Sequence, residues 1–197
     1  MKKCYVFVLM LVMTTTSRAF ITDVDSGVNV MSVKVMPTAD LTKVPVRVSL
    51  TNSLAFTCVQ CFLATPDSVD TFFYLDDADS NASAQDSTKR NNSKSVAYTP
   101  TERWAGSHMP ILAWNTKSCP DAMMILIVSP KNEIFAGNDG PLITLYFNAT
   151  ALADGDYSVR MTGANMAWID NKNIKAVYSP DTMARFAIRG GKLITTD

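Results

Sequence analysis

Apolar and polar residues alternate with a period of two along much of the chain, which predicts β-strands rather than helices. The clearest example is VPVRVSL, residues 44–50, where Pro45, Arg47 and Ser49 point away from the apolar side chains. Proline donates no ladder hydrogen bond, so this strand is expected to begin at Pro45 or to lie at a sheet edge. Residues 123–128 are continuously apolar, which is typical of a strand buried on both faces.

A loop rich in turn residues separates this run from a second apolar run at residues 142–147. The loop contains Gly137, Asn138 and Gly140, and Asp139-Gly140 supplies the positive-φ backbone of a tight turn. The pattern predicts that the two runs pair as a β-hairpin at the centre of an all-β domain.

Other short strands are predicted at intervals of about ten residues, and no helical pattern of normal length is present. The predicted ranges are 28–36, 56–64, 71–75, 111–115, 157–162, 166–169, 174–178 and 183–188. Turns such as Asp170-Asn171-Lys172-Asn173 separate them. About nine such strands predict an all-β, two-sheet, jelly-roll-like sandwich.

The first residues have the pattern of an export signal rather than of a fold. Lys2 and Lys3 precede an apolar run at residues 5–13, and Ser17-Arg18-Ala19 forms a small-x-small cleavage site. The run is too short to span a membrane, so residues 1–19 are predicted to be a cleaved signal peptide. We therefore expect a secreted, periplasmic or cell-surface protein with no membrane span.

The remaining chain divides into a lead-in at residues 20–27 and a single domain at residues 28–197. A long polar loop without apolar periodicity is predicted at about residues 76–95. Removal of the signal peptide takes Lys2, Lys3 and Arg18 from a chain of formal charge 0, which leaves −3. The absence of a Lys/Arg cluster argues against nucleic acid as a partner.

Three cysteines remain after export: Cys58, Cys61 and Cys119. Three residues along a strand span ~10 Å, which is too far for a Cys58–Cys61 disulfide. Cys119 could pair with Cys58 or Cys61 in an exported protein, and three free, buried thiols are the alternative. One histidine and three scattered cysteines do not suit zinc.

Several stretches in order along the chain resemble cohesin-like modules of exported bacterial proteins. They are VPVRVSLTN at residues 44–52, the strand ending at Pro66, Arg103, His108, ILIVS at residues 125–129 and IFAGNDGPLITL at residues 134–145. The resemblance covers roughly residues 28–189.

The resemblance implies a sandwich of about nine strands that is related to carbohydrate-binding modules. It also implies a non-catalytic, exported module that binds another exported or cell-surface protein through one sheet face, in the setting of extracellular polysaccharide utilisation. The chain holds a single module and no dockerin-like repeat, so the resemblance supports the fold more than it supports dockerin binding.

Catalytic residues are not expected. His108 is the only histidine, and neither a Gly-x-Ser-x-Gly elbow nor a nucleophilic cysteine accompanies it. His108 is interpreted as a structural residue that helps Arg103 to fix a loop together with Gly137, Asn138 and Gly140.

The alternative function is carbohydrate binding, because Trp104 and Trp114 could offer flat faces to sugar rings. Three aspartates in the polar loop, Asp76, Asp77 and Asp79, could collect calcium. They lack the spacing of a known calcium loop, so no metal and no cofactor are predicted.

Overall fold

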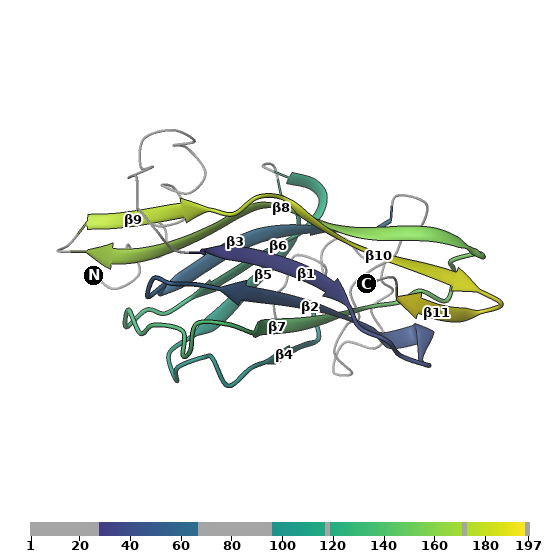
Figure 1. Ribbon diagram of the computed structural model, residues 1–197, viewed down its shortest axis with the longest axis horizontal. Coiled ribbons are helices and arrows are strands. Elements are labelled where there is room, and N and C mark those ends of the chain that lie inside the picture. Colours follow the sequence, from purple (N-terminus) through teal and green to yellow (C-terminus); the bar gives the residue numbers. More distant parts are fainter. Residues whose placement is uncertain (1–27, 67–95, 117–118, 171–172, 196–197) are drawn as a thin grey trace.

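The computed structural model describes residues 28–66, 96–116, 119–170 and 173–195. These residues form eleven strands and one 3₁₀ turn, arranged as two β-sheets packed face to face (Figure 1). The predicted signal peptide, the predicted strand at 71–75 and the polar loop at 76–95 lie outside the described residues. The predicted all-β sandwich is confirmed, with more strands than the sequence indicated.

The larger sheet has seven strands, all antiparallel to their neighbours. In order across the sheet they are β11 (Lys192–Thr195), β10 (Thr182–Arg189), β8 (Gly155–Asp170), β3 (Cys58–Ala64), β6 (Cys119–Val128) and β5 (Met109–Thr116), and β9 (Asn173–Tyr178) pairs with the second half of β8.

The smaller sheet has four strands in the order β1 (Val30–Val35), β2 (Val44–Thr51), β7 (Pro141–Phe147) and β4 (Tyr98–Pro100). A 3₁₀ turn, η1 (Leu41–Lys43), connects β1 to β2. Asp40 caps this turn, since its Oδ1 accepts a hydrogen bond of 2.9 Å from the Thr42 N–H.

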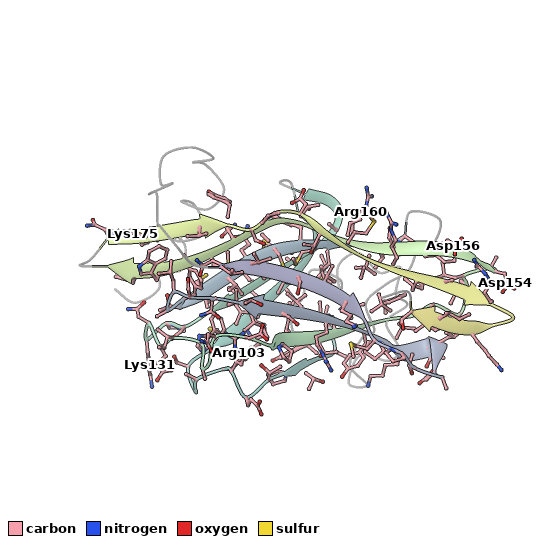
Figure 2. All side chains as sticks on the ribbon, viewed as in Figure 1. Arg103, Lys131, Asp154, Asp156, Arg160 and Lys175 are labelled. Atoms are coloured by element: carbon pink, nitrogen blue, oxygen red, sulfur yellow. The ribbon has the colours of Figure 1, made fainter. Side chains whose placement is uncertain are left out.

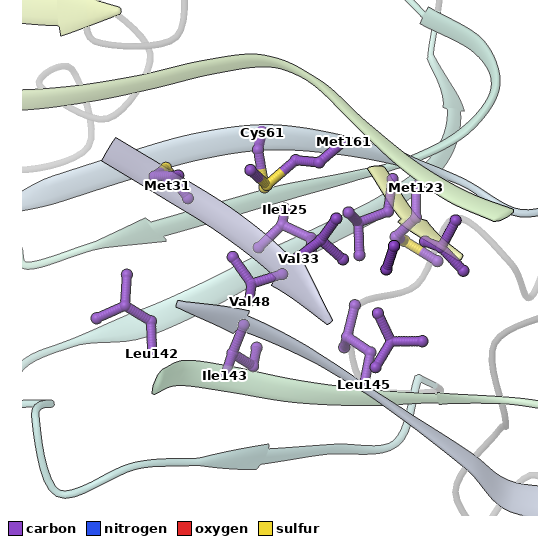
Figure 3. Close-up of a cluster of buried hydrophobic side chains, with 14 of the residues drawn as sticks. Met31, Val33, Val48, Cys61, Met123, Ile125, Leu142, Ile143, Leu145 and Met161 are labelled. Atoms are coloured by element: carbon purple, nitrogen blue, oxygen red, sulfur yellow. The ribbon is translucent and has the colours of Figure 1, made fainter. Parts of the chain in front are cut away.

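The core lies between the two sheets and is made by every second residue of their strands. In β2, Val44, Val46, Val48 and Leu50 are all fully buried. Figure 3 shows side chains of both sheets meeting in this layer, with Val48 on one side and Ile125 on the other. Each side chain of this size contributes about 1.5–3 kcal/mol by leaving water, so the alternation seen in the sequence supplies much of the force that closes the sandwich.

The predicted central hairpin is wrong, because its two strands belong to different sheets. β6 pairs with β3 and β5, whereas β7 pairs with β2 and β4. The connection between them bonds to other segments instead of turning back: Phe135 N–H donates to Phe56 O at 3.0 Å, and Ala136 N–H donates to Arg103 O at 2.8 Å. The predicted positive φ is present, at +66° for Gly137 and +117° for Gly140, but these residues lie in a connection that crosses from one sheet to the other.

Two other strands differ from expectation. β2 begins at Val44, as Pro45 suggested, but it lies inside its sheet between β1 and β7. The predicted strands at 157–162 and 166–169 are one strand, β8, which continues through Gly163 at a φ of +58°. Glycine adopts this φ without a side-chain penalty, so the strand bends there without ending.

Candidate functional site

The side of the seven-stranded sheet that points away from the interior is apolar, although an antiparallel sheet usually presents polar residues on its outward side. In β3, Val59 and Cys61 belong to the core between the sheets, so Cys58 and Phe62 point outward. We name seven apolar outward residues the outer strip: Cys58, Phe62, Ala122, Met124, Leu126, Val128 and Ala167.

Strand pairing arranges this outward side as three cross-strand rows. From β5 towards β9, the rows are Met109–Val128–Cys58–Ala167–Ala176, Ile111–Leu126–Gln60–Asn165–Tyr178 and Ala113–Met124–Phe62–Thr162. The side chains of the outer strip are buried, and the four-stranded sheet packs on the opposite side of these strands. The rows are open at both ends, because Met109 is 48 % exposed and Tyr178 is 46 % exposed.

One polar group among these rows lacks a hydrogen bond. Asn165 is 6 % exposed, and its Nδ2 donates to Gly163 O at 3.3 Å while its Oδ1 is buried without a partner. A buried acceptor without a donor costs about 1–3 kcal/mol. This side of the sheet therefore combines an apolar centre with one unused acceptor.

Arg103 lies at the end of the sandwich that also carries Lys131 (Figure 2) and is 4 % exposed. Its guanidinium donates only to neutral acceptors. They are Ala136 O at 2.7 Å, Gly140 O at 3.0 Å, Gly137 O at 3.2 Å, Asn52 Oδ1 at 2.6 Å and Leu50 O.

This cluster ties the end of β2 to the loop before β7, which contains Gly137 and Gly140. Asn138 takes part through its main chain, since its carbonyl accepts from the Asn52 N–H at 2.8 Å. Burial lowers the pKa of the Arg103 guanidinium, and the nearby Asp139 carboxylate opposes that change. The guanidinium is occupied by the fold, so it is not free to bind a ligand.

His108 is held in the same region by different contacts. Its Nδ1 accepts a hydrogen bond of 2.8 Å from the Ala105 N–H, and its ring stacks on Phe135 at 4.2 Å between centroids. Its Nε2 is buried without a partner. Burial lowers the pKa of His108, so the neutral ring is favoured.

Ser107 and His108 do not form a nucleophile–base pair. Ser107 Oγ bonds to the Glu133 carboxylate and lies 2.6 Å from Ser129 Oγ. The Ser107 N–H also donates to Glu133 at 2.9 Å, and these bonds lower the pKa of the Glu133 carboxyl. A catalytic serine needs a histidine nitrogen that accepts the proton of its Oγ, whereas here Nδ1 accepts from the main chain and Nε2 has no hydrogen-bond partner.

Trp104, predicted as a sugar platform, is half-buried and engaged in packing. Its Nε1 donates to Leu142 O at 2.6 Å, and its ring stacks against Tyr98 at 6.1 Å between centroids. Trp114 lies in β5 opposite Met123, and its side chain is outside the described residues.

The predicted pairing of Cys119 with Cys58 or Cys61 does not form, because Cys58 and Cys61 are free and buried. Cys61 lies opposite Ile125 in β6, six residues and therefore ~20 Å from Cys119. A disulfide requires Cα atoms within about 7 Å. Burial raises the pKa of both thiols to about 12, which keeps them protonated and unreactive.

The aspartates considered for calcium, Asp76, Asp77 and Asp79, lie outside the described residues. Within the described ranges, no group of three His, Cys, Asp or Glu residues is placed to hold a metal ion. The same part of the chain contains no helix long and apolar enough to cross a membrane.

Sequence comparison identifies no relatives: no family model matches the chain, and neither does any curated protein. Structural comparison finds cohesin modules. The sixth cohesin of scaffoldin B from Acetivibrio cellulolyticus, solved in complex with a dockerin, matches with a TM-score of 0.50 and 9 % identity over 80 % of this chain and 97 % of that chain.

Two further cohesins match with TM-scores of 0.49. A non-cellulosomal cohesin from the archaeon Archaeoglobus fulgidus is 12 % identical over 81 % of this chain and 91 % of that chain. The seventh ScaB type I cohesin from Pseudobacteroides cellulosolvens is 11 % identical over 78 % of this chain and 90 % of that chain. At such low identity the likeness concerns the fold. The chain folds as a cohesin-like β-sandwich domain.

Proposed function

We propose that this domain is a non-catalytic, exported binding module that takes a protein partner on the outward side of its seven-stranded sheet. The observation that carries the proposal is the set of three cross-strand rows, in which Leu126 is central and Met109 and Tyr178 are exposed at opposite ends. Protein interfaces combine an apolar, aromatic centre with a few well-placed hydrogen bonds.

Tyr178 belongs to the same row as Asn165, is 46 % exposed and is a residue type that often dominates binding energy. Asn165 Oδ1 itself is buried, so a partner makes its first contacts at Tyr178 and Met109. The preferred partner is therefore a protein with an apolar contact surface that reaches both exposed ends of the rows.

One sequence prediction and one structural observation support this function. The predicted signal peptide would place the partner outside the cytoplasm, on the cell surface or among secreted proteins. The absence of a nucleophile–base pair at Ser107 and His108 favours binding over hydrolysis. The alternative function, carbohydrate binding through Trp104 and Trp114, gains no support from the packing of Trp104.

The test is affinity capture from the secreted and surface proteins of the source organism, followed by binding measurements with the captured protein. Tyr178→Ala and Met109→Arg change exposed residues at the two ends of the rows and should each weaken binding at least tenfold. Thr144→Arg, on the outward side of the other sheet, is the matched control and should change binding less than twofold.

Capture that is equally strong for all three variants would refute the assignment of the surface. Failure to capture any protein with the unmodified domain would refute the proposed function itself. Melting temperatures of the variants, measured in parallel, exclude loss of folding as the cause of weaker binding.

A further inference from the structure

The outward side of the four-stranded sheet has a different chemistry, centred on a row that crosses all four strands. Strand pairing places Lys34 opposite Arg47, Arg47 opposite Thr144, and Thr144 opposite Thr99. The side chains of all four residues point away from the core, because the neighbouring positions of β1, β2 and β7 are buried in it. We name these four residues the basic row.

The two cations of the basic row face each other across neighbouring strands, an arrangement that does not stabilise the fold. Like charges directly opposite each other on antiparallel strands destabilise the pair, and Lys34 and Arg47 are such a pair. Arg47 Nε is also buried without a hydrogen-bond partner. Lys34 also has a partner within the protein, whereas Arg47 holds a donor, Nε, that no group of the described residues accepts.

The residues beside the basic row extend the same chemistry. Tyr146 OH lies 2.7 Å from Thr99 Oγ1, and Lys43 Nζ lies 4.9 Å from the centre of the Tyr146 ring. Two carboxylates lie beside these strands and both accept hydrogen bonds: Asp40, near Lys43, accepts from Thr42, and Asp139 accepts from Thr51 Oγ1 at 2.6 Å. The outward positions of the four strands themselves carry hydroxyl groups and cations but no carboxylate.

We propose that this side of the sheet binds an acidic polysaccharide, with its carboxylate or sulfate groups on Arg47 and Lys34 and its hydroxyl groups on Thr144 and Thr99. Charge complementarity selects a polyanion, and neighbouring strands ~4.8 Å apart present donors at regular steps to an extended chain. The row lacks the apolar centre that a protein interface uses, which favours a hydrophilic, hydroxyl-rich ligand. This surface lies on the sheet opposite to the proposed protein-binding side, so each can be tested without the other.

The experiment is affinity electrophoresis of the intact domain at low salt in gels that contain polygalacturonate, dextran sulfate, neutral dextran or polyglutamate. The double variant Lys34→Gln/Arg47→Gln is compared with Arg185→Gln/Lys192→Gln, which removes the same charge from exposed positions of the other sheet. We expect polygalacturonate or dextran sulfate, but not neutral dextran, to retard the unmodified domain.

The first double variant should weaken this binding at least tenfold and the control less than twofold, and Thr144→Val should weaken it two- to fivefold. Preference between the two polysaccharides assigns the anionic group as carboxylate or sulfate. The melting temperatures of both double variants are measured in parallel, so that weaker binding is separated from loss of folding. Three results would overturn the proposal: no retardation by either polysaccharide, equal losses in the two double variants, or retardation by polyglutamate as strong as that by the polysaccharides.

Discussion

The outward sides of the two sheets differ in how apolar and polar residues follow one another along their strands. In β2 of the four-stranded sheet, apolar residues strictly alternate with Pro45, Arg47 and Ser49, and the outward side is polar. In β3 and β6 of the seven-stranded sheet the alternation is lost, and outward residues such as Phe62 and Leu126 are as apolar as the core. Loss of alternation in an antiparallel strand thus identifies the side of the sheet that must be kept from water.

The difference also separates two kinds of recognition. The apolar side gains affinity from the area of its exposed ends, Met109 and Tyr178, that a partner removes from water, at roughly 25 cal/mol per Å². A side that carries Lys34 and Arg47 gains from charge and hydroxyl groups and is weakened by salt. One domain can therefore hold a protein on one sheet and a polyanion on the other.

The largest effect on stability is expected at the hydrogen bonds of Arg103, which lie at one end of the sandwich and join β2 to the loop before β7. Arg103→Met should lower the free energy of unfolding by about 3–5 kcal/mol, because main-chain carbonyls that now accept from the guanidinium would lose their donors. Arg185→Met, at an exposed position of β10, should change it by less than about 0.5 kcal/mol. Urea denaturation measures both, and equal effects would show that the cluster does not stabilise the fold.

The next test places the same charge on both outward sides. Leu126→Glu should cost about 2–4 kcal/mol, because it buries a carboxylate in the outer strip. Thr144→Glu should be neutral or slightly stabilising beside Arg47. If both variants melted at the same temperature, the contrast between the two sides would be wrong.

The sequence predicted the strands of the core well, since alternation reports burial directly. It did not predict which strands pair, because the apolar runs of β6 and β7 look alike whether they form one hairpin or belong to two sheets. β4 was missed because its three exposed residues carry no apolar period. The sequence predicts two strands in place of the long β8, because a glycine such as Gly163 within an apolar pattern indicates the end of a strand.

The site was predicted in part. The family resemblance names Arg103, Gly137 and Gly140, but residues 34 and 37 positions apart carry no sequence signal that they touch, and only the structure shows the bonds between them. The rows that join Leu126 to Asn165 depend on register between segments far apart in sequence, which periodicity does not encode. The continuously apolar run at residues 123–128 was the one available signal of the outer strip.

A smaller effect on stability is expected at Gly163, where the bend in β8 lies against Phe62 of the outer strip. At Gly163, with a φ of +58°, a Cβ atom would lie 3.0 Å from Phe62 Cδ2. Gly163→Ala should therefore cost about 1–2 kcal/mol from backbone conformation and from displacement of Phe62. Gly106→Ala, where a Cβ would meet nothing within 4 Å, is the control and should be nearly neutral in thermal denaturation. A neutral Gly163→Ala would mean that Phe62 moves freely and that the strip is loosely packed.

The smallest effect concerns pH at the loop where His108 lies, directly before Met109 at the start of β5. The folded state lowers the pKa of His108 below its ordinary value of 6.5, so the unfolded chain binds more protons near that pH and stability falls as the pH drops through 6.5. His108→Asn keeps an acceptor for the Ala105 N–H and removes the titration. Because His108 is the only histidine, urea denaturation at pH 7.5 and 5.5 should show a loss of stability in the unmodified domain that is smaller in this variant.

Ser107 lowers the pKa of the Glu133 carboxyl, so protonation of Glu133 reduces stability only below its ordinary value of 4.5. The two groups therefore titrate in separate pH ranges. Identical losses in the domain and the variant between pH 7.5 and 5.5 would assign the pH dependence to other groups and contradict the neutral, buried state of His108.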